Sequence, residues 1–254
     1  MIGDGSLSQD LFADTSRSVP APRSAGAVFT ELPPERPPSS RQRDRRPVDR
    51  ATRLIDLVVA SLLLIVLAPV MLLIAVLVRA TSPGPALFKQ TRVGCRRQPF
   101  VMLKFRTMAA NCGDDVHRDF VCRMLRGEDP RHDSGAGLYK LEDDQRVTPL
   151  GRFLRATSLD ELPQLINVVR GDMALVGPRP ALAWEVELFQ PHHHERFMVK
   201  PGMTGLWQVS GRCRLTMSAA LDLDVTYVRR RSLTFDLWIL MKTIPAVLSR
   251  RATR

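Results

Sequence analysis

The residue types most suggestive of chemistry gather in one stretch of the chain, RVTPLGRFLRATSLDELPQLINVVRGDMALVGPRP, from Arg146 to Pro180. It contains an adjacent acid pair, Asp160 and Glu161. Its arginines are Arg146, Arg152, Arg155, Arg170 and Arg179. Two carboxylates among several guanidinium groups suit a site that handles anionic phosphates through a divalent cation. The stretch therefore predicts phosphate chemistry at the acid pair.

The same acid pair also has a purely structural interpretation. The pattern Ser158-Leu-Asp-Glu161 is typical of a capping box, in which Ser158 starts a helix and Glu161 reaches back to it. Four apolar residues at helical spacing would form the buried face of that helix: Leu162, Leu165, Ile166 and Val169. Gly171 would end it. Capping requires none of the arginines, whereas a helix N-terminus surrounded by them suits a phosphate.

The whole chain is basic, with 37 Lys and Arg residues against 26 Asp and Glu and a formal net charge of +11. This surplus favours an anionic partner, namely nucleic acid, acidic lipid or a phosphorylated substrate. Aromatic residues make up only 6% of the chain and nothing resembles a nucleic-acid module, so no nucleic-acid partner is expected. The cysteines form no C-x-x-C pair, which indicates isolated thiols in a reducing compartment.

One long apolar segment, Leu57 to Val78, contains no charged residue and is long enough to cross a bilayer as a helix. Pro69 lies just past its middle, where proline removes a backbone hydrogen bond and kinks a helix. Both flanks are basic, so the positive-inside rule assigns neither end to the outside. We therefore predict a re-entrant membrane helix over residues 51–80 that dips into one leaflet and returns. A straight spanning helix is the alternative.

Two other regions flank this helix. Residues 1–50 are rich in Pro, Ser and Arg without apolar periodicity, which predicts a disordered tail, and the first residues lack the features of a signal peptide. Residues 81–250 have a soluble character and are predicted to form the catalytic domain. Near its end, Trp238 among apolar residues and flanking arginines is typical of a helix lying in the membrane interface.

Within the domain, two short strands, Ala86 to Gln90 and Phe100 to Phe105, are predicted to form a hairpin. Residues 109–145 are polar and irregular, which indicates a mobile loop or lid with a short helix from Val116 to Leu125. The predicted fold class is α+β. It comprises a mainly helical catalytic domain with a small β-hairpin, an N-terminal re-entrant membrane helix and interfacial amphipathic helices.

Two further polar groups receive no functional assignment from the sequence. His192, His193 and His194 are consecutive, so they cannot all face one metal ion, and we interpret them as part of an exposed loop. Asp222 and Asp224 lie in an L-D-L-D alternation that suits either a half-exposed strand or a helix end.

Six blocks, in order from Arg53 to about Thr243, make the chain resemble the monotopic phosphoglycosyl transferases of the bacterial sugar transferase family. Besides the stretch that contains the acid pair, the blocks are RLIDLVVASLLLIVLAPV, SPGPALFKQTRVG, KFRTM, KPGMTGLWQVSGR and LDLDVTYVRRRSLTFDLWILMKT. The resemblance implies transfer of a sugar phosphate from a UDP-sugar to polyprenyl (undecaprenyl) phosphate, with release of UMP. This would be the first membrane step of exopolysaccharide or cell-envelope glycan synthesis, at the cytoplasmic face of the bacterial plasma membrane.

The resemblance also implies roles for individual residues. Asp160 falls on the nucleophile and magnesium ligand, and Glu161 on the second member of the dyad, also at the metal. Arg155 falls on the arginine associated with the polyprenyl phosphate. The turn associated with the uridine nucleotide falls on Gly177, Pro178, Arg179 and Pro180, with Arg179 as the favoured contact. The position at which the family breaks its re-entrant helix falls on Pro69, although Ala68 stands where a serine commonly precedes that proline.

Two rival functions remain open from the sequence. A membrane-tethered, non-catalytic binding protein for acidic lipid or nucleic acid would also use a basic surface, but it would release no UMP from a UDP-sugar. A transferase that moves the sugar without its phosphate would release UDP instead. Galactose and glucose phosphates are consistent with the resemblance, N-acetylated sugars stay open, and the oligomeric state is unknown.

Overall fold

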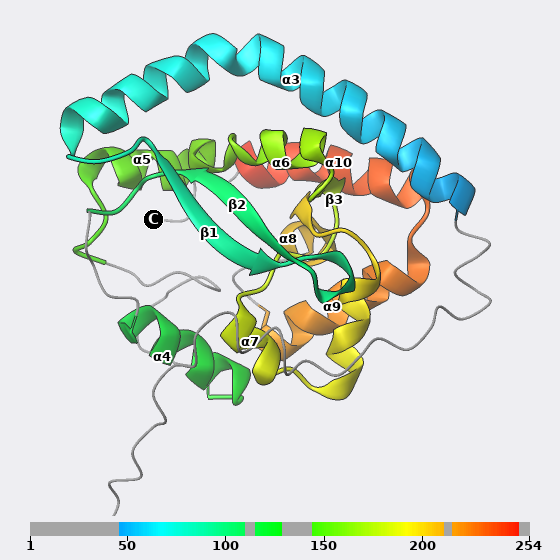
Figure 1. The fold of residues 1–254 in the computed structure, drawn as a ribbon. Coiled ribbons are helices and arrows are strands. Elements are labelled where there is room, and N and C mark those ends of the chain that lie inside the picture. The colour runs from blue at the N-terminus through cyan, green and yellow to red at the C-terminus, as the bar shows by residue number, and fades with distance from the viewer. Residues whose placement is uncertain (1–45, 110–114, 129–143, 211–214, 249–254) are drawn as a thin grey trace, which may run out of the picture. The chain divides into compact units, whose positions relative to one another are not determined.

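The computed structural model describes residues 46–109, 115–128, 144–210 and 215–248, which contain a mainly helical domain with two small sheets (Figure 1). In chain order the helices and strands are α3 (Arg46–Thr81), β1 (Leu87–Val93), β2 (Pro99–Phe105), α4 (Asp115–Leu125), α5 (Pro149–Thr157), α6 (Gln164–Arg170), β3 (Ala174–Val176), α7 (Ala183–Glu187), β4 (Gly202–Thr204), α8 (Leu206–Val209), α9 (Met217–Arg230) and α10 (Leu233–Leu248). Three 3₁₀ helices are η1 (Cys95–Arg97), η3 (Leu159–Glu161) and η4 (Pro191–Met198). The predictions of a mainly helical domain, a β-hairpin and a short helix ending at Leu125 are confirmed.

Helix α3 contains the apolar segment and continues without interruption through Pro69. It begins at Arg46, so its first turn lies inside the segment predicted as tail. Figure 1 shows it as an arch that bends near its middle. By length and composition it is able to cross a membrane, and only 11% of its most apolar window is buried.

The two ends of α3 are buried against the domain, while its middle is exposed. Residues at helical spacing are buried near each end: Thr52, Asp56 and Ala60 in the first half, and Ile74 and Val78 in the second. Between them, large apolar side chains are exposed: Leu62, Leu63, Ile65, Val66, Val70, Leu72 and Leu73. A long exposed apolar surface on a folded domain marks an interaction with lipid or protein.

Polar contacts fix both ends of α3 to the same domain. Near the start of the helix, Arg53 donates to the carbonyl oxygens of Val168 and Val169, at 2.5 and 2.8 Å. After its end, Arg106 donates to the carbonyl oxygens of Ser82 and Pro83, at 2.8 and 2.7 Å. Arg53 thus satisfies the C-terminus of α6, and Arg106 fixes the turn that follows α3.

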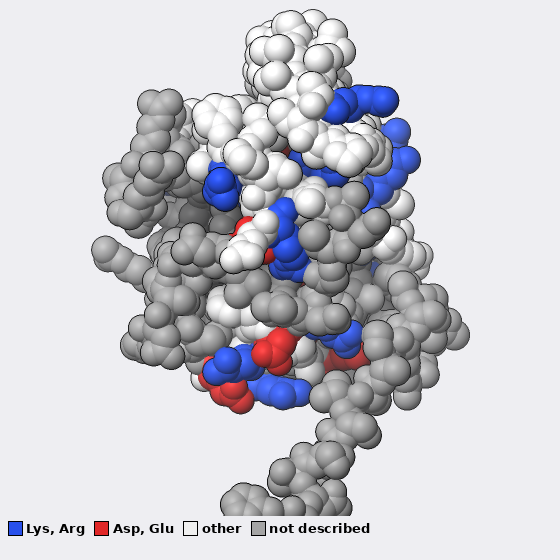
Figure 2. All heavy atoms as spheres, turned by 90° about the vertical axis from the view of Figure 1, so that its left-hand side faces the viewer, with Lys and Arg blue, Asp and Glu red and all other residues white. Residues whose placement is uncertain are grey.

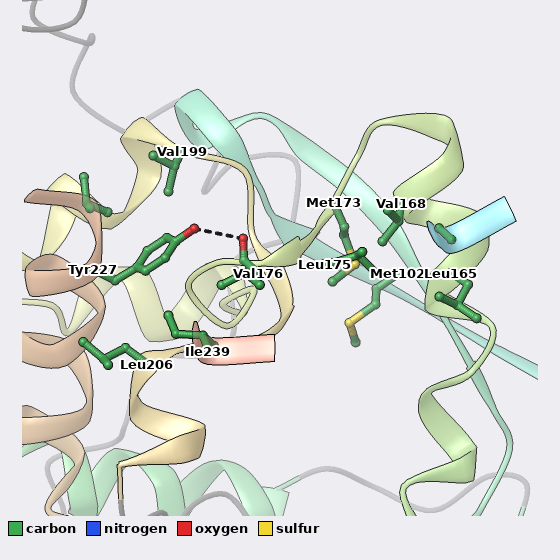
Figure 3. Close-up of a cluster of buried hydrophobic side chains, with 12 residues drawn as sticks. Met102, Leu165, Val168, Met173, Leu175, Val176, Val199, Leu206, Tyr227 and Ile239 are labelled. Carbon is green, nitrogen blue, oxygen red and sulfur yellow. Dashed lines mark hydrogen bonds between the residues drawn. The ribbon is translucent and has the colours of Figure 1, made fainter. Parts of the chain in front are cut away.

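The core lies between the two sheets and helices α6, α9 and α10. Strands β1 and β2 pair antiparallel, while β3 and β4 form a short parallel pair. Labelled members of the core in Figure 3 are Met102, Leu165, Val168, Met173, Leu175, Val176, Val199, Leu206, Tyr227 and Ile239. The Tyr227 hydroxyl lies 3.2 Å from the Val176 carbonyl oxygen, so the phenol is hydrogen-bonded within this apolar cluster.

Two local predictions are wrong. The consecutive histidines do not form an exposed loop, because they lie in the 3₁₀ helix η4 and His193 is only 2% exposed. Asp222 and Asp224 lie inside the helix α9, where Asp224 is buried. The tail over residues 1–45 and most of the predicted lid, residues 110–114 and 129–143, lie outside the described residues.

Candidate active site

The acid pair lies in a short 3₁₀ turn between two helices. Helix α5 ends at Thr157, and Ser158 follows in the left-handed conformation with φ 60° and ψ 15°. For a residue other than glycine this conformation costs about 1–2 kcal/mol. The chain then forms η3, which contains Asp160 and Glu161 and packs against α5 and β2. The left-handed Ser158 thus ends α5 just before the acid pair, and Asp160 and Glu161 lie in the short turn between α5 and α6.

The capping-box interpretation of this pair is wrong. Ser158 makes no capping hydrogen bond with its side chain, and the helix predicted to start there begins at Gln164. The carboxylate of Glu161 instead pairs with Lys104. Only the predicted end of the helix is confirmed, because Gly171 adopts a φ of 93° after α6.

Lys104, on strand β2, is the main site residue that the sequence did not single out. Its Nζ atom lies 3.1 Å from Glu161 Oε1, and its side chain is 18% exposed. Burial lowers the pKa of Lys104, while the nearby carboxylates of Glu161 and Asp160 raise it and the Arg179 guanidinium lowers it. The side chain therefore lies among the predicted catalytic and nucleotide-binding residues, close enough to respond to their charges.

Arg155, on α5, is also electrostatically coupled to the acid pair. Its Nε atom donates to Thr107 Oγ1 at 3.0 Å. Burial lowers the pKa of Arg155, and the carboxylates of Asp160 and Asp144 oppose that effect. The guanidinium of Arg155 is thus near enough to Asp160 for the two charges to interact.

Of the other arginines of the stretch, Arg146 is near enough to Arg155 to lower its pKa. Arg146 forms a two-pronged ion pair with Asp144, with N–O distances of 2.7 Å for both prongs. This contact lowers the pKa of Asp144. Arg152 and Arg170 are exposed. Of the five arginines, Arg179 therefore lines a pocket with Glu161, and Arg155 interacts electrostatically with Asp160.

Arg179 and Glu161 line one pocket together with residues from four other parts of the chain. The other polar side chains of its lining are Arg92, Lys104, Gln164 and Gln208. Three cations against one carboxylate make this lining basic, which suits an anionic ligand. Pro180 and Gly202 also line the pocket, so the predicted nucleotide turn and the KPGMTG turn meet there.

Backbone contacts hold these two turns together. Gly177 N donates to Thr204 O at 2.8 Å, and Gly202 N donates to Pro178 O at 2.9 Å. A Cβ atom on Gly202 would lie only 2.0 Å from Gly177 N, so no larger residue fits without moving the turn. On the other side, Arg92 Nη1 donates to Pro180 O at 3.1 Å. The turn from Gly177 to Pro180 is therefore fixed from both sides.

A buried ion pair supports the same turn from behind. Arg196 Nη2 donates to Arg179 O at 2.6 Å and to Asp224 Oδ2 at 2.7 Å. Both side chains of the pair are 2% exposed. Burial raises the pKa of Asp224 to about 7, although Arg196 lowers it. Through Arg196, Asp224 positions the backbone of Arg179, a role that its sequence pattern did not indicate.

The chemistry of the donor set fits Mg²⁺. Asp160 and Glu161 are neighbours in the chain and both carry a carboxylate, the kind of ligand that this ion prefers. Lys104, Arg155 and Arg179 suit phosphate groups that would share the ion with these carboxylates. On the face seen in Figure 2, the uncharged surface of α3 stands at the top and basic side chains gather beneath it.

Comparison with known proteins identifies the family. The family model described as bacterial sugar transferase matches residues 48–250. The exopolysaccharide production protein ExoY of Sinorhizobium fredii is 41% identical over 201 residues, which cover 79% of this chain and 87% of the relative.

Two further relatives are named for their substrates. The UDP-glucose:undecaprenyl-phosphate glucose-1-phosphate transferase of Caulobacter vibrioides is 41% identical over 80% of this chain and 71% of its own length. The undecaprenyl-phosphate galactose phosphotransferase of Salmonella typhimurium is 41% identical over 78% of this chain but only 40% of its own length. With its sequence matched over most of its length, the chain belongs to the bacterial sugar transferase family and is a bacterial phosphoglycosyl transferase.

Proposed function

We propose that this protein transfers a hexose-1-phosphate from a UDP-sugar to undecaprenyl phosphate, releases UMP and so starts an exopolysaccharide or cell-envelope glycan. The observation that carries the proposal is the pairing of Glu161 with Lys104 at a pocket that Arg179 also lines, with Asp160 next to Glu161 in the chain. The charge of Asp160 also affects the pKa of Lys104 and of Arg155. The names of the Caulobacter and Salmonella relatives support a hexose phosphate and an undecaprenyl carrier. Glucose and galactose both agree with these names.

In the first step, a carboxylate oxygen of Asp160 attacks the phosphorus that carries the sugar. The bond from this phosphorus to the oxygen of UMP breaks, and UMP leaves with the electron pair. The sugar phosphate stays on Asp160 as an acyl phosphate. Lys104 and Arg179 supply positive charge where negative charge develops on the phosphate oxygens. Mg²⁺ held by Asp160 and Glu161 would neutralise part of the diphosphate charge.

In the second step, an oxygen of undecaprenyl phosphate attacks the same phosphorus and expels the Asp160 carboxylate. The products are the lipid diphosphate sugar and the regenerated enzyme. Arg155 suits the phosphate of the lipid, because its neighbour Leu154 packs against Ile74 and Val78 of α3. A lipid held beside α3 would thus present its phosphate next to Arg155 and Asp160.

The arrangement of α3 supports a re-entrant position in the membrane. Its exposed apolar middle would enter the hydrocarbon, while Arg53 and Arg106 keep both ends on the domain. The apolar face of α10, formed by Leu237, Trp238, Met241 and Ile244, suits the interface predicted from Trp238. Both features would hold the site at the height of the lipid headgroups, with the domain on the cytoplasmic side.

The test is the first half-reaction with the protein alone. With a UDP-sugar and Mg²⁺ but no lipid phosphate, wild-type protein should release UMP once and retain the labelled sugar phosphate. Asp160→Asn keeps the side-chain shape but cannot form an acyl phosphate, so both signals should vanish while the protein stays folded. Normal UMP release by folded Asp160→Asn would refute the proposal.

The same assay separates the two rival functions. A binding protein for acidic lipid or nucleic acid would release no nucleotide, and a transferase of the unphosphorylated sugar would release UDP. A panel of UDP-hexoses and UDP-N-acetylhexosamines in this assay would identify the sugar.

A further inference from the structure

A second cluster of metal-ligating side chains lies outside the site described above. His192 Nε2 lies 2.8 Å from Asp222 Oδ1, and His193 Nε2 lies 3.0 Å from the same oxygen. The three potential ligand atoms all lie within 4.8 Å of one another. The histidines belong to η4 and the aspartate to α9, so the cluster joins two elements that pack together.

The backbone conformation alone does not bring the two imidazole rings together. Successive residues of a 3₁₀ helix, with about three residues per turn, point about 120° apart. The rings of His192 and His193 nevertheless lie with their centroids 4.0 Å apart. Burial holds the ring of His193 in place, whereas the side chains of His192 and Asp222 are 44% and 53% exposed. One ligand is therefore fixed and two are accessible to an ion from solvent.

We propose that His192, His193 and Asp222 form a binding site for a borderline transition-metal ion such as Zn²⁺. Two imidazole nitrogens and one carboxylate oxygen form a ligand set that binds such ions in preference to Mg²⁺. A tetrahedral ion with bonds of about 2.0–2.1 Å holds its ligand atoms about 3.4 Å apart. The observed separations from Asp222 Oδ1 are shorter by a few tenths of an ångström, so a small movement of the exposed side chains admits the ion. Water would complete the coordination.

The surroundings indicate an exchangeable ion of moderate affinity. A histidine that binds a metal through Nε2 carries its proton on Nδ1, and strong sites provide an acceptor for it. Among the described residues, the buried Nδ1 of His193 has no hydrogen-bond partner. We therefore expect a dissociation constant on the order of 1 µM, weaker than that of a structural zinc site.

The site would act on the same pair of elements that supports the nucleotide turn. Arg196 in η4 and Asp224 in α9 form the buried ion pair that holds the backbone of Arg179. A metal ion bound to His192, His193 and Asp222 would link η4 to α9 a second time, close to this pair. Metal binding should therefore stabilise the contact between η4 and α9 that supports the backbone of Arg179, whether or not the proposed reaction is correct.

The experiment is a titration of Zn²⁺ into the metal-stripped, full-length protein in detergent, with excess Mg²⁺ to occupy the acid pair. Wild-type protein should bind Zn²⁺ at this site and gain thermal stability. His192→Ala and Asp222→Asn each remove an exposed ligand and should weaken this binding at least about 10-fold. Asp222→Asn keeps the shape of the side chain, so its fold should be preserved.

His194→Gln is the matched control, because this neighbouring imidazole lies beside Phe189 and Phe197 and outside the cluster. It should bind Zn²⁺ as the wild type does. With Co²⁺ as a spectroscopic probe, the wild type and His194→Gln should show visible absorption that the two ligand variants lack. Equal Zn²⁺ binding by wild type and Asp222→Asn, or none by wild type, would overturn the proposal.

Discussion

Among the site residues, Lys104 has the largest consequence for the chemistry proposed at the acid pair. At rest its ammonium pairs with Glu161, 3.1 Å away, and burial lowers its pKa. An incoming diphosphate would compete for the same positive charge. Loss of one such charged donor from a transition state typically costs about 10²–10³ in rate.

Replacement of Lys104 by methionine should therefore slow UMP release at saturating UDP-sugar by about 100-fold. The apolar replacement has a similar length, so the strand should remain intact. Lys89→Met on the neighbouring strand is the control, because Lys89 is exposed and lies outside the pocket lining. An equal rate in Lys104→Met and wild type, measured in the first half-reaction, would exclude a role for Lys104 in the chemistry.

The site residues differ in how well the sequence could predict them. Asp160 and Arg155 lie in one short stretch, so the sequence could single them out, whereas their individual roles come from the family resemblance and stay predictions. Lys104 and Asp224 reach the site from distant parts of the chain, and a single charged residue in a strand or helix is usually a solvated one. Only the pairings across the fold, with Glu161 and Arg196, distinguish them.

At the scale of elements, the local sequence predicted the hairpin and the end of α6. It did not predict the left-handed residue before the acid pair. Phe100 to Phe105 is a short, mainly apolar run that forms most of β2, and Gly171 ended the helix as predicted. Ser158 has none of the usual preference for a positive φ, so its left-handed conformation is imposed by the packing around it. The same packing pairs Glu161 with Lys104 instead of leaving it as a cap.

The contact between η4 and α9 has a pH dependence that follows from Asp224. Its folded pKa of about 7 lies above the ordinary 3.8, so between these values the folded protein keeps a proton that the unfolded chain has released. The contribution of this group to stability is therefore present below about pH 4 and is lost as the pH rises to about 7. Asp224→Asn cannot titrate, and it leaves Arg196 without a charged partner above about pH 7, where it should lower stability.

Melting temperatures at about pH 5 and about pH 7 test this sign. Wild type should lose more stability between the two values than Asp224→Asn does. Asp119→Asn, a change at an exposed aspartate of α4, should retain the wild-type difference. Identical differences for all three proteins would show that Asp224 does not titrate in this range.

At the scale of the whole described domain, the position of α3 is the feature that its sequence left open. Length and composition allowed either a spanning or a re-entrant helix, because both flanks are basic. The structure adds that Arg53 and Asp56 bind the domain near one end, through Val168, Val169 and Leu175. Arg106 binds the turn after the other end. A spanning helix would have to break one of these sets of contacts, and we propose the re-entrant arrangement for this reason.

Single cysteines on the two sides of the apolar segment test this arrangement, in a background without the native cysteines. Arg50→Cys lies before the segment and Glu128→Cys lies in the domain after it, and both positions are exposed. In intact cells both cysteines should resist a membrane-impermeant thiol reagent, and both should react once the cells are permeabilised. Pro69→Leu restores a hydrogen-bond donor in the middle of α3 and should straighten it, so some Arg50→Cys molecules that also carry this change should become labelled from outside. Labelling of Arg50→Cys alone in the presence of Pro69 would mean that α3 spans the membrane, and that the contacts of Arg53 and Asp56 with the domain do not form in the cell.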